Sequence, residues 1–175
     1  MYDFNHLYEP ASVNEAIEMM HLYPEAKIIA GGSDLLVQLR DGVHAGCDLI
    51  SIYMLDELRG ITINGQGDIR IGALTSFSKI TKNPLIQKYI SVLGDAADTV
   101  GGPQIRNIGT IGGNICNGHT GADTASTLFA LDALIEVTDK NGVHIMPVSE
   151  FYKTNGGVHL NGAQLLTAVI IPKES

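Results

Sequence analysis

The sequence predicts an α+β fold made of two subdomains, residues 1–56 and residues 57–175, because the pattern of the chain changes near Asp56. Before this residue, short β-like runs alternate with helical runs, which favours a small and largely parallel sheet. After it, pairs of runs with alternating apolar and polar residues flank glycine-containing turns, which favours an antiparallel sheet with helices beside it.

Three strands and two helices are expected in residues 1–56. Ser12 and Glu15 have the spacing of a capping box at the start of the first helix, and Pro24 ends that helix. Gly31 and Gly32 interrupt the second β-like run. The expected strands are 3–8, 27–30 and 48–53, and the expected helices are 12–23 and 34–40.

Residues 57–175 are expected to hold two hairpins, a final strand and several helices. A helical pattern over 76–100 is expected to break at Pro84 and Gly94, and a second helix is expected over 122–131, directly after a glycine-rich turn over 109–118. The expected strands are 60–64 paired with 69–72, 134–138 paired with 143–147, and 165–171.

The composition argues against several classes of function. The chain has 11 basic and 19 acidic residues, a net charge of −8 and a pI near 5.0, which disfavours nucleic acids and anionic membranes as partners. No apolar stretch is long enough to span a bilayer, and residues 1–10 lack the features of a signal peptide. We therefore expect a cytoplasmic protein that does not contact membranes.

Metal and nucleophile signals are weak. Two cysteines are too few for a disulfide framework or a four-cysteine cluster, and the six histidines lack metal-ligand spacing. Cys116 and His119, separated by two residues, are only a faint metal pattern, and no Gly-x-Ser-x-Gly elbow is present. We expect no metal ligands and no catalytic side chain.

The first glycine-rich turn, over 31–34, follows Lys27 and precedes the expected short helix. Glycine allows close approach of a ligand, and consecutive backbone N–H groups in such a turn form an anion site. The turn matches neither a Walker loop nor the Gly-x-Gly-x-x-Gly fingerprint. It is interpreted either as a diphosphate site or as a plain connection between strand and helix.

The second glycine-rich turn, over 109–118, has glycines at four positions with Asn114 and Asn117 between them. It is interpreted as a site of close ligand approach or as a long loop. Asp123 is expected to open the next helix, either as a capping acid or as an acceptor for ligand hydroxyls. Arg106 either contacts phosphate or, as we favour, locks the loop by donating to backbone carbonyls. Together the two turns predict one dinucleotide held from two sides.

These residues resemble a known family. Residues 30–35 resemble the first FAD motif, and residues 110–115 followed by Asp123 the second FAD motif, of the flavin subunit of molybdenum hydroxylases. The bacterial xanthine dehydrogenase FAD-binding subunits are the most similar over 102–107, 114–118 and 57–62.

The resemblance implies an FAD-binding domain of the p-cresol methylhydroxylase/vanillyl-alcohol oxidase type, with FAD between its two subdomains. It places on the diphosphate and adenosine side Lys27, Ile28, Ile29, Ala30, Gly31, Gly32, Ser33, Asp34 and Leu35. It places on the opposite side Gly109, Thr110, Gly112, Gly113, Asn114 and Cys116, with Ala122 and Asp123 at sugar-like hydroxyls and Leu166 near the flavin ring. Val100 and Gly101 stand where some relatives carry an aromatic residue over that ring.

The resemblance also implies partners. A molybdopterin-binding subunit would oxidise a purine or another heterocycle, and an iron–sulfur subunit with [2Fe–2S] clusters would pass electrons to FAD, which reduces NAD. From the resemblance we expect the family's smaller C-terminal domain to be absent from this chain. The alternatives are the flavin subunit of a carbon monoxide or nicotinate dehydrogenase, a non-catalytic assembly module of the same fold, and a stand-alone flavin oxidase, for which the chain is short.

Overall fold

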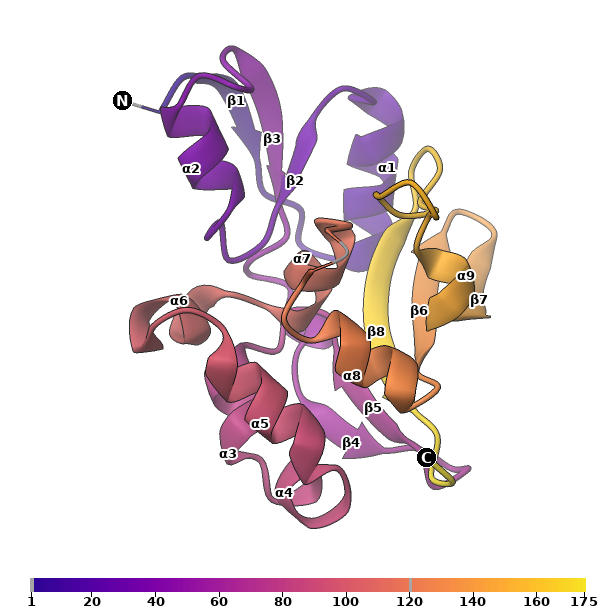
Figure 1. Ribbon diagram of the computed structural model, residues 1–175. Coiled ribbons are helices and arrows are strands. Elements are labelled where there is room, and N and C mark those ends of the chain that lie inside the picture. The colour runs from indigo at the N-terminus through magenta and orange to yellow at the C-terminus, as the bar shows by residue number, and fades with distance from the viewer. Residues whose placement is uncertain (1, 120) are drawn as a thin grey trace.

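The computed structural model describes residues 2–119 and 121–175. The first part of the chain forms a three-stranded parallel sheet in the order β1-β3-β2. Figure 1 shows these strands between helices α2 and α1. The elements are β1 (Phe4–Tyr8), α1 (Val13–Leu22), β2 (Lys27–Ile29), α2 (Leu35–Arg40) and β3 (Cys47–Ser51). The parallel pairing expected from the alternating pattern is confirmed.

The start of α1 follows the capping pattern in part. Ser12 is the N-cap, and its hydroxyl accepts a hydrogen bond from the backbone N–H of Glu15. The carboxylate of Glu15, however, accepts from the N–H of Ala11 and not from that of Ser12. The carboxylate of Glu57 accepts from the N–H of Val13, so a residue distant in sequence satisfies another free donor of this helix.

The second part forms a five-stranded antiparallel sheet in the order β4-β5-β8-β6-β7. Both expected hairpins are present, and the final strand lies at the centre, where every residue is buried. A single-turn 3-10 helix, η1 (Asp56–Leu58), precedes the sheet. The strands are β4 (Ile61–Ile63), β5 (Ile69–Gly72), β6 (Leu134–Asp139), β7 (Gly142–Pro147) and β8 (Leu165–Ile171).

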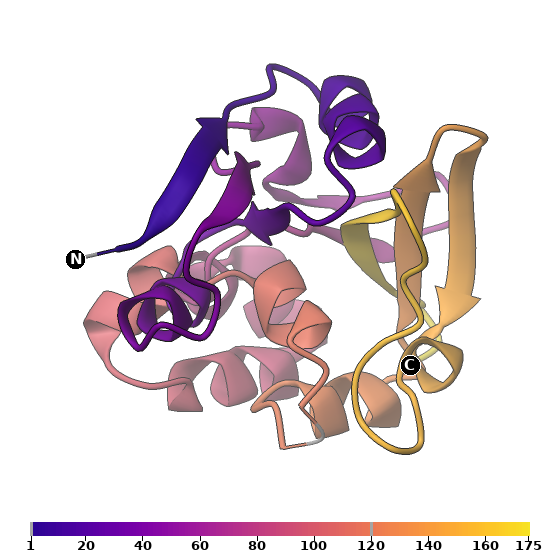
Figure 2. The ribbon, with the colours of Figure 1, turned by 90° about the horizontal axis from the view of Figure 1, so that it is seen from above.

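Helices cover one face of the five-stranded sheet, as Figures 1 and 2 show. The main core lies between this face and the helices, with Phe77, Leu93 and Leu128 packed near Ile135 and Val169. A smaller core joins α1 to the 52–58 segment and to the start of β8. The helices are α3 (Phe77–Lys82), α4 (Pro84–Tyr89), α5 (Ser91–Thr99), α6 (Pro103–Ile108), α7 (Ile111–Cys116), α8 (Ala125–Ala130) and α9 (Val148–Phe151). None of the helices described here has the length and hydrophobicity needed to cross a bilayer.

One expected helix break is wrong. Pro84 does begin a new helix, but Gly94 lies inside α5, and the chain breaks at Ile90 instead. A Cβ at position 94 would lie 2.9 Å from the side-chain nitrogen of Gln87. Gly94 is therefore explained by the close packing of α5 against α4 and not by helix termination.

The glycine-rich segment over 109–118 is also not a loop, because its centre is helix α7. Thr110 caps this helix by accepting from the N–H of Gly113 at 3.2 Å. The first two N–H groups of α7 donate outside the helix. That of Ile111 donates to the carbonyl of Thr75, and that of Gly112 donates to the carbonyl of Ala73. These bonds to the sheet region offset the helix-destabilising effect of the two glycines.

Candidate functional site

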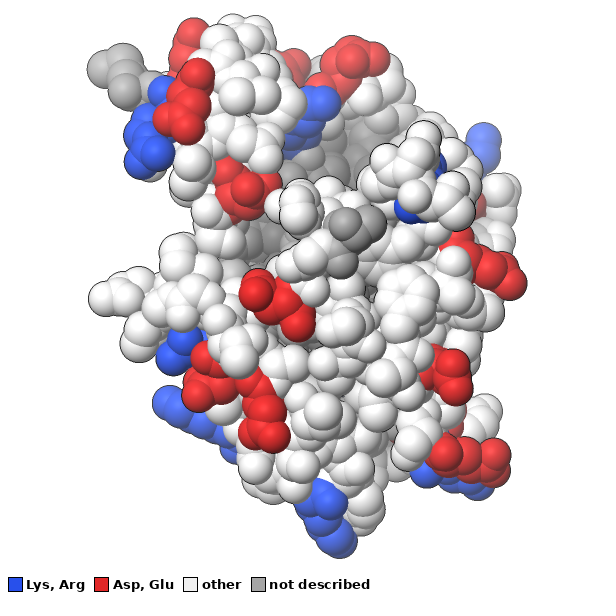
Figure 3. All heavy atoms as spheres, viewed as in Figure 1, with Lys and Arg blue, Asp and Glu red and all other residues white. Residues whose placement is uncertain are grey.

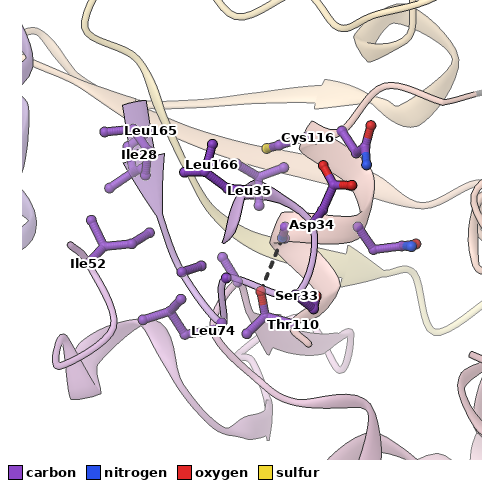
Figure 4. Close-up of a pocket in the computed structure, with 18 of the residues that line it drawn as sticks. Ile28, Ser33, Asp34, Leu35, Ile52, Leu74, Thr110, Cys116, Leu165 and Leu166 are labelled. Carbon is purple, nitrogen blue, oxygen red and sulfur yellow. Dashed lines mark hydrogen bonds between the residues drawn. The ribbon is translucent and has the colours of Figure 1, made fainter. Parts of the chain in front are cut away.

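A cavity of about 470 Å³ lies between the two parts of the chain. Its volume is in the range of small-molecule and cofactor sites. Figure 4 shows apolar side chains gathered on one side, with Ser33, Asp34 and Thr110 on the other. The apolar side chains that Figure 4 labels are Ile28, Leu35, Ile52, Leu74, Leu165 and Leu166.

The loop after β2 lines this cavity and has unused backbone donors. The N–H groups of residues 31–35 donate no hydrogen bond to any other described residue, and all five of these residues line the cavity. Gly32 has φ +72°, a conformation that glycine adopts without strain. A run of free N–H groups around such a residue is suited to an anion.

Gly31 has a different role from Gly32. A Cβ on Gly31 would lie only 1.7 Å from the carbonyl oxygen of Ile108, the last residue of α6. Gly31 thus lets the loop rest directly on the end of α6. The first glycine-rich turn is held in place by the segment that leads into the second.

Helix α7 contributes a surface to the cavity but no free N–H groups at its start. The N–H groups of Ile111, Gly112 and Gly113 are all bonded to other residues of the chain. Gly112 is packed, since a Cβ there would lie 2.8 Å from Ala73. At Gly113 a Cβ would meet only the hydroxyl of Thr110, at 3.0 Å. The start of α7 therefore offers no free N–H group to an anion, and Gly113, where a Cβ would meet only the Thr110 hydroxyl, lines the cavity.

Asp123 does not open a helix, because α8 begins at Ala125 with Thr124 as its N-cap. Asp123 is exposed and does not line the cavity. The neighbouring residue, Thr124, makes a polar contact with α7: its buried hydroxyl donates to the side-chain oxygen of Asn114 at 2.7 Å. Asn114 lines the cavity.

Three titratable side chains line the cavity: Lys27, Asp34 and Cys116. Burial raises the pKa of the Cys116 thiol to about 12, so this thiol stays neutral near pH 7. The carboxylate of Asp34 accepts a hydrogen bond from Gln38 within α2. Neither the neutral thiol nor this bonded carboxylate is arranged as a nucleophile with a neighbouring base.

Arg106 has the structural role that the sequence favoured. Its guanidinium donates to the carbonyls of Val100 and Gly101, at 3.3 and 2.8 Å, and pairs with Asp98 at 3.3 Å. These bonds hold the turn between α5 and α6.

Most residues implied by the family resemblance line one cavity, although they come from distant parts of the sequence. Those lining it are Lys27, Ile28, Ala30, Gly31, Gly32, Ser33, Asp34, Leu35, Val100, Thr110, Gly112, Gly113, Asn114, Cys116 and Leu166. Those not lining it are Ile29, Gly101, Gly109, Ala122 and Asp123.

The cavity also has lining residues that were not among the predicted site residues. Ile105 and Asn117 lie in segments that carry the family resemblance, whereas the others carried no motif and reach the cavity wall through the packing of the fold. These residues are Met20, Ile52, Ala73, Leu74, Phe77, Ile105, Asn117, Leu160, Gly162, Gln164 and Leu165.

The surface agrees with the acidic composition. Figure 3 shows acidic and basic side chains interspersed over the face it presents, with a hollow between the part that carries α2 and the part that carries α6. Among the residues that the structure describes, no group of three or more potential ligands is arranged to hold a metal ion.

Comparisons with known proteins show the family to which the chain belongs. Residues 2–174 match the family model described as the FAD binding domain in molybdopterin dehydrogenase. The chain is 37% identical over 174 residues to a xanthine dehydrogenase FAD-binding subunit of Escherichia coli O157:H7, covering 99% of this chain and 60% of that protein. It is 34% identical over 178 residues to a nicotinate dehydrogenase FAD-subunit of Eubacterium barkeri, again covering 99% and 60%.

The fold is similar to that of a solved relative. A chain of carbon monoxide dehydrogenase from Hydrogenophaga pseudoflava superposes with a TM-score of 0.93 at 29% identity, over 98% of this chain and 60% of that one. This similarity confirms the expected α+β fold. The chain spans about three fifths of the length of these relatives.

Proposed function

The chain belongs to the family of FAD-binding domains of molybdopterin dehydrogenases, and from this premise we propose that it is the FAD-binding part of a xanthine dehydrogenase-like molybdenum hydroxylase. In this role it would receive electrons from [2Fe–2S] clusters on an iron–sulfur subunit and pass them to NAD. A separate molybdopterin-binding subunit would oxidise the heterocyclic substrate.

The observation that carries the proposal is the run of free N–H groups over residues 31–35 at the cavity wall. A diphosphate needs several donors at once, and this loop offers consecutive ones without a competing partner in the chain. Lys27 lines the same cavity and supplies a positive charge. The residues present therefore fit the diphosphate of FAD, on one side of the cavity and not on two.

The apolar side of the cavity fits the flavin ring. Leu165 and Leu166 are 5% and 2% exposed, and Ile52 and Leu74 are also buried. These side chains exclude water from a flat aromatic group placed against them. Bound FAD would supply the exchange between one-electron centres and a two-electron acceptor, while the chain supplies position and surroundings. Consistent with this division, we propose that no side chain here acts as a general acid or base.

The identity of the whole enzyme is proposed from the relatives. The xanthine dehydrogenase subunit is 37% identical to the chain, the nicotinate dehydrogenase subunit 34%, and the carbon monoxide dehydrogenase medium chain of Hydrogenophaga pseudoflava 32%. This order favours a purine or a related heterocycle as the substrate class of the complex.

The experiment is reconstitution of the purified chain with FAD, followed by a visible spectrum and HPLC of the released chromophore. We expect FAD at one equivalent per chain. The assembled complex is then assayed with xanthine, nicotinate and carbon monoxide, with NAD as acceptor, and xanthine with NAD is expected to give the highest rate. A folded chain that takes up no flavin, alone or in the complex, would instead support a non-catalytic assembly module.

A further inference from the structure

Thr124 occupies a helix N-cap position but does not act as a cap. Threonine hydroxyls at this position normally accept a hydrogen bond from the second or third N–H of the helix. Thr124 makes no such bond to α8. Its side chain is instead fully buried, and its hydroxyl donates to the side-chain oxygen of Asn114 on α7. The capping interaction is replaced by a contact between two helices.

This contact determines which end of the Asn114 amide faces the cavity. An asparagine side chain has an oxygen that accepts and a nitrogen that donates, and the two ends have nearly the same shape. The 2.7 Å bond from Thr124 occupies the oxygen. The amide nitrogen makes no hydrogen bond to another described side chain or carbonyl, and Asn114 lines the cavity. The free end of this amide is therefore its donor.

We propose that Thr124 is a positioning residue, which holds the Asn114 NH₂ group ready to donate to an acceptor atom of the bound cofactor. This inference rests on the proposed function, since it takes FAD as the occupant of the cavity.

The contact also has a purely structural interpretation, in which it only ties α7 to α8. The two interpretations differ in how Thr124 and Asn114 depend on each other. If Thr124 acts on FAD through Asn114, a change at 124 has no further effect on FAD affinity once the Asn114 amide is absent. If the contact is only a structural tie, its loss lowers thermal stability without a matching change in FAD affinity, so the effect of T124V on affinity separates the two interpretations.

The test measures the FAD dissociation constant by flavin fluorescence quenching, and thermal unfolding without FAD, for the unaltered chain and a set of variants. T124V removes the hydroxyl at nearly constant shape, T124S restores it, and N114L removes the amide. We expect T124V to weaken FAD binding about tenfold, as the loss of one polar contact does. We expect T124S to bind like the unaltered chain, and T124V in the N114L background to bind like N114L.

Tight FAD binding by T124V, or an equal loss from T124V with and without N114L, would overturn the inference. The variant N114D provides a second test, which does not depend on whether T124V folds. It keeps an acceptor for Thr124 but replaces the NH₂ donor with an anionic oxygen, so it is expected to weaken FAD binding, and normal binding by N114D would overturn the inference as well. Failure of the unaltered chain to bind FAD would contradict the proposed function itself, and the inference with it.

Discussion

Gly113→Val is expected to weaken FAD binding strongly while the chain still folds. Gly113 is the third residue of α7, and its open face lines the cavity. A Cβ there would contact only the Thr110 hydroxyl, at 3.0 Å, and that hydroxyl can rotate away. The added isopropyl group would then extend into the space that we assign to FAD.

The effect on folding is expected to be small because one small term partly offsets the other. Valine is a better helix former than glycine by roughly 0.4 kcal/mol. Displacing the Thr110 hydroxyl weakens the helix cap, at a cost of about 1 kcal/mol. A net change below about 1 kcal/mol corresponds to a shift in Tm of roughly 2–4 °C for a chain of this size.

The effect on binding is expected to be much larger. Extra carbons in a filled site cost about 1–3 kcal/mol or more, which is roughly 5- to 150-fold in dissociation constant. Flavin fluorescence quenching measures the affinity, and a thermal scan without FAD measures the fold. Gly65→Val is the matched control, because a Cβ there has open space around it and Gly65 does not line the cavity.

The outcome that refutes this reasoning is a Gly113→Val chain that binds FAD as tightly as the Gly65→Val control, with the same Tm. Loss of binding together with loss of the fold would mean that position 113 is packed as tightly as its neighbour. Gly112→Val is the comparison for that case, since a Cβ at 112 would lie 2.8 Å from the Ala73 carbonyl oxygen.

Three further predictions concern stability and reactivity. Gly31→Ala should lower Tm sharply in a thermal scan, because its Cβ would lie 1.7 Å from the last carbonyl oxygen of α6, whereas Gly65→Ala should leave Tm unchanged. Burial raises the pKa of Glu136, but the hydrogen bonds it accepts, two of them from Arg70, outweigh burial and hold that pKa below its usual value. The ionised carboxylate therefore stabilises the fold above the unfolded-state pKa, and this contribution is lost as the pH falls through the folded-state pKa. In urea unfolding, Arg70→Met should cost about 1 kcal/mol at pH 7, because solvent screens this partly exposed pair, and should cost less in acid. Mass spectrometry after iodoacetamide treatment at pH 8 should find Cys116 unmodified in the folded chain and modified in urea, because its thiol pKa is about 12.

The strands could be predicted from the sequence because their signals are local. Alternation with period two and turn residues such as Asn141-Gly142 specify a hairpin within about fifteen residues of chain. The parallel sheet followed from the alternation of strands and helices. In each case the residues that make the contact also carry the pattern.

The errors arose where distant contacts overrule local preference. Glycine disfavours helices, yet α7 forms because Ile111 and Gly112 donate to carbonyls of a segment far earlier in the chain. Gly94 was taken as a break because its packing against Gln87 leaves no trace in the local pattern. The bond from Thr124 to Asn114 likewise joins two helices, and only the folded chain reveals it.

The two glycine-rich motifs have unequal roles, and the structure explains why they occur together. The first motif carries the free N–H groups, whereas the first N–H groups of α7 are bonded within the chain. The link between the motifs is Gly31, which rests on the carbonyl of Ile108 immediately before the second motif begins. Helix α7 in turn is fixed to the sheet region through Ala73 and Thr75. The second motif therefore anchors the wall against which the first is placed, so a substitution that shifts α7 is expected to disturb the anion-binding loop although it removes none of that loop's donors.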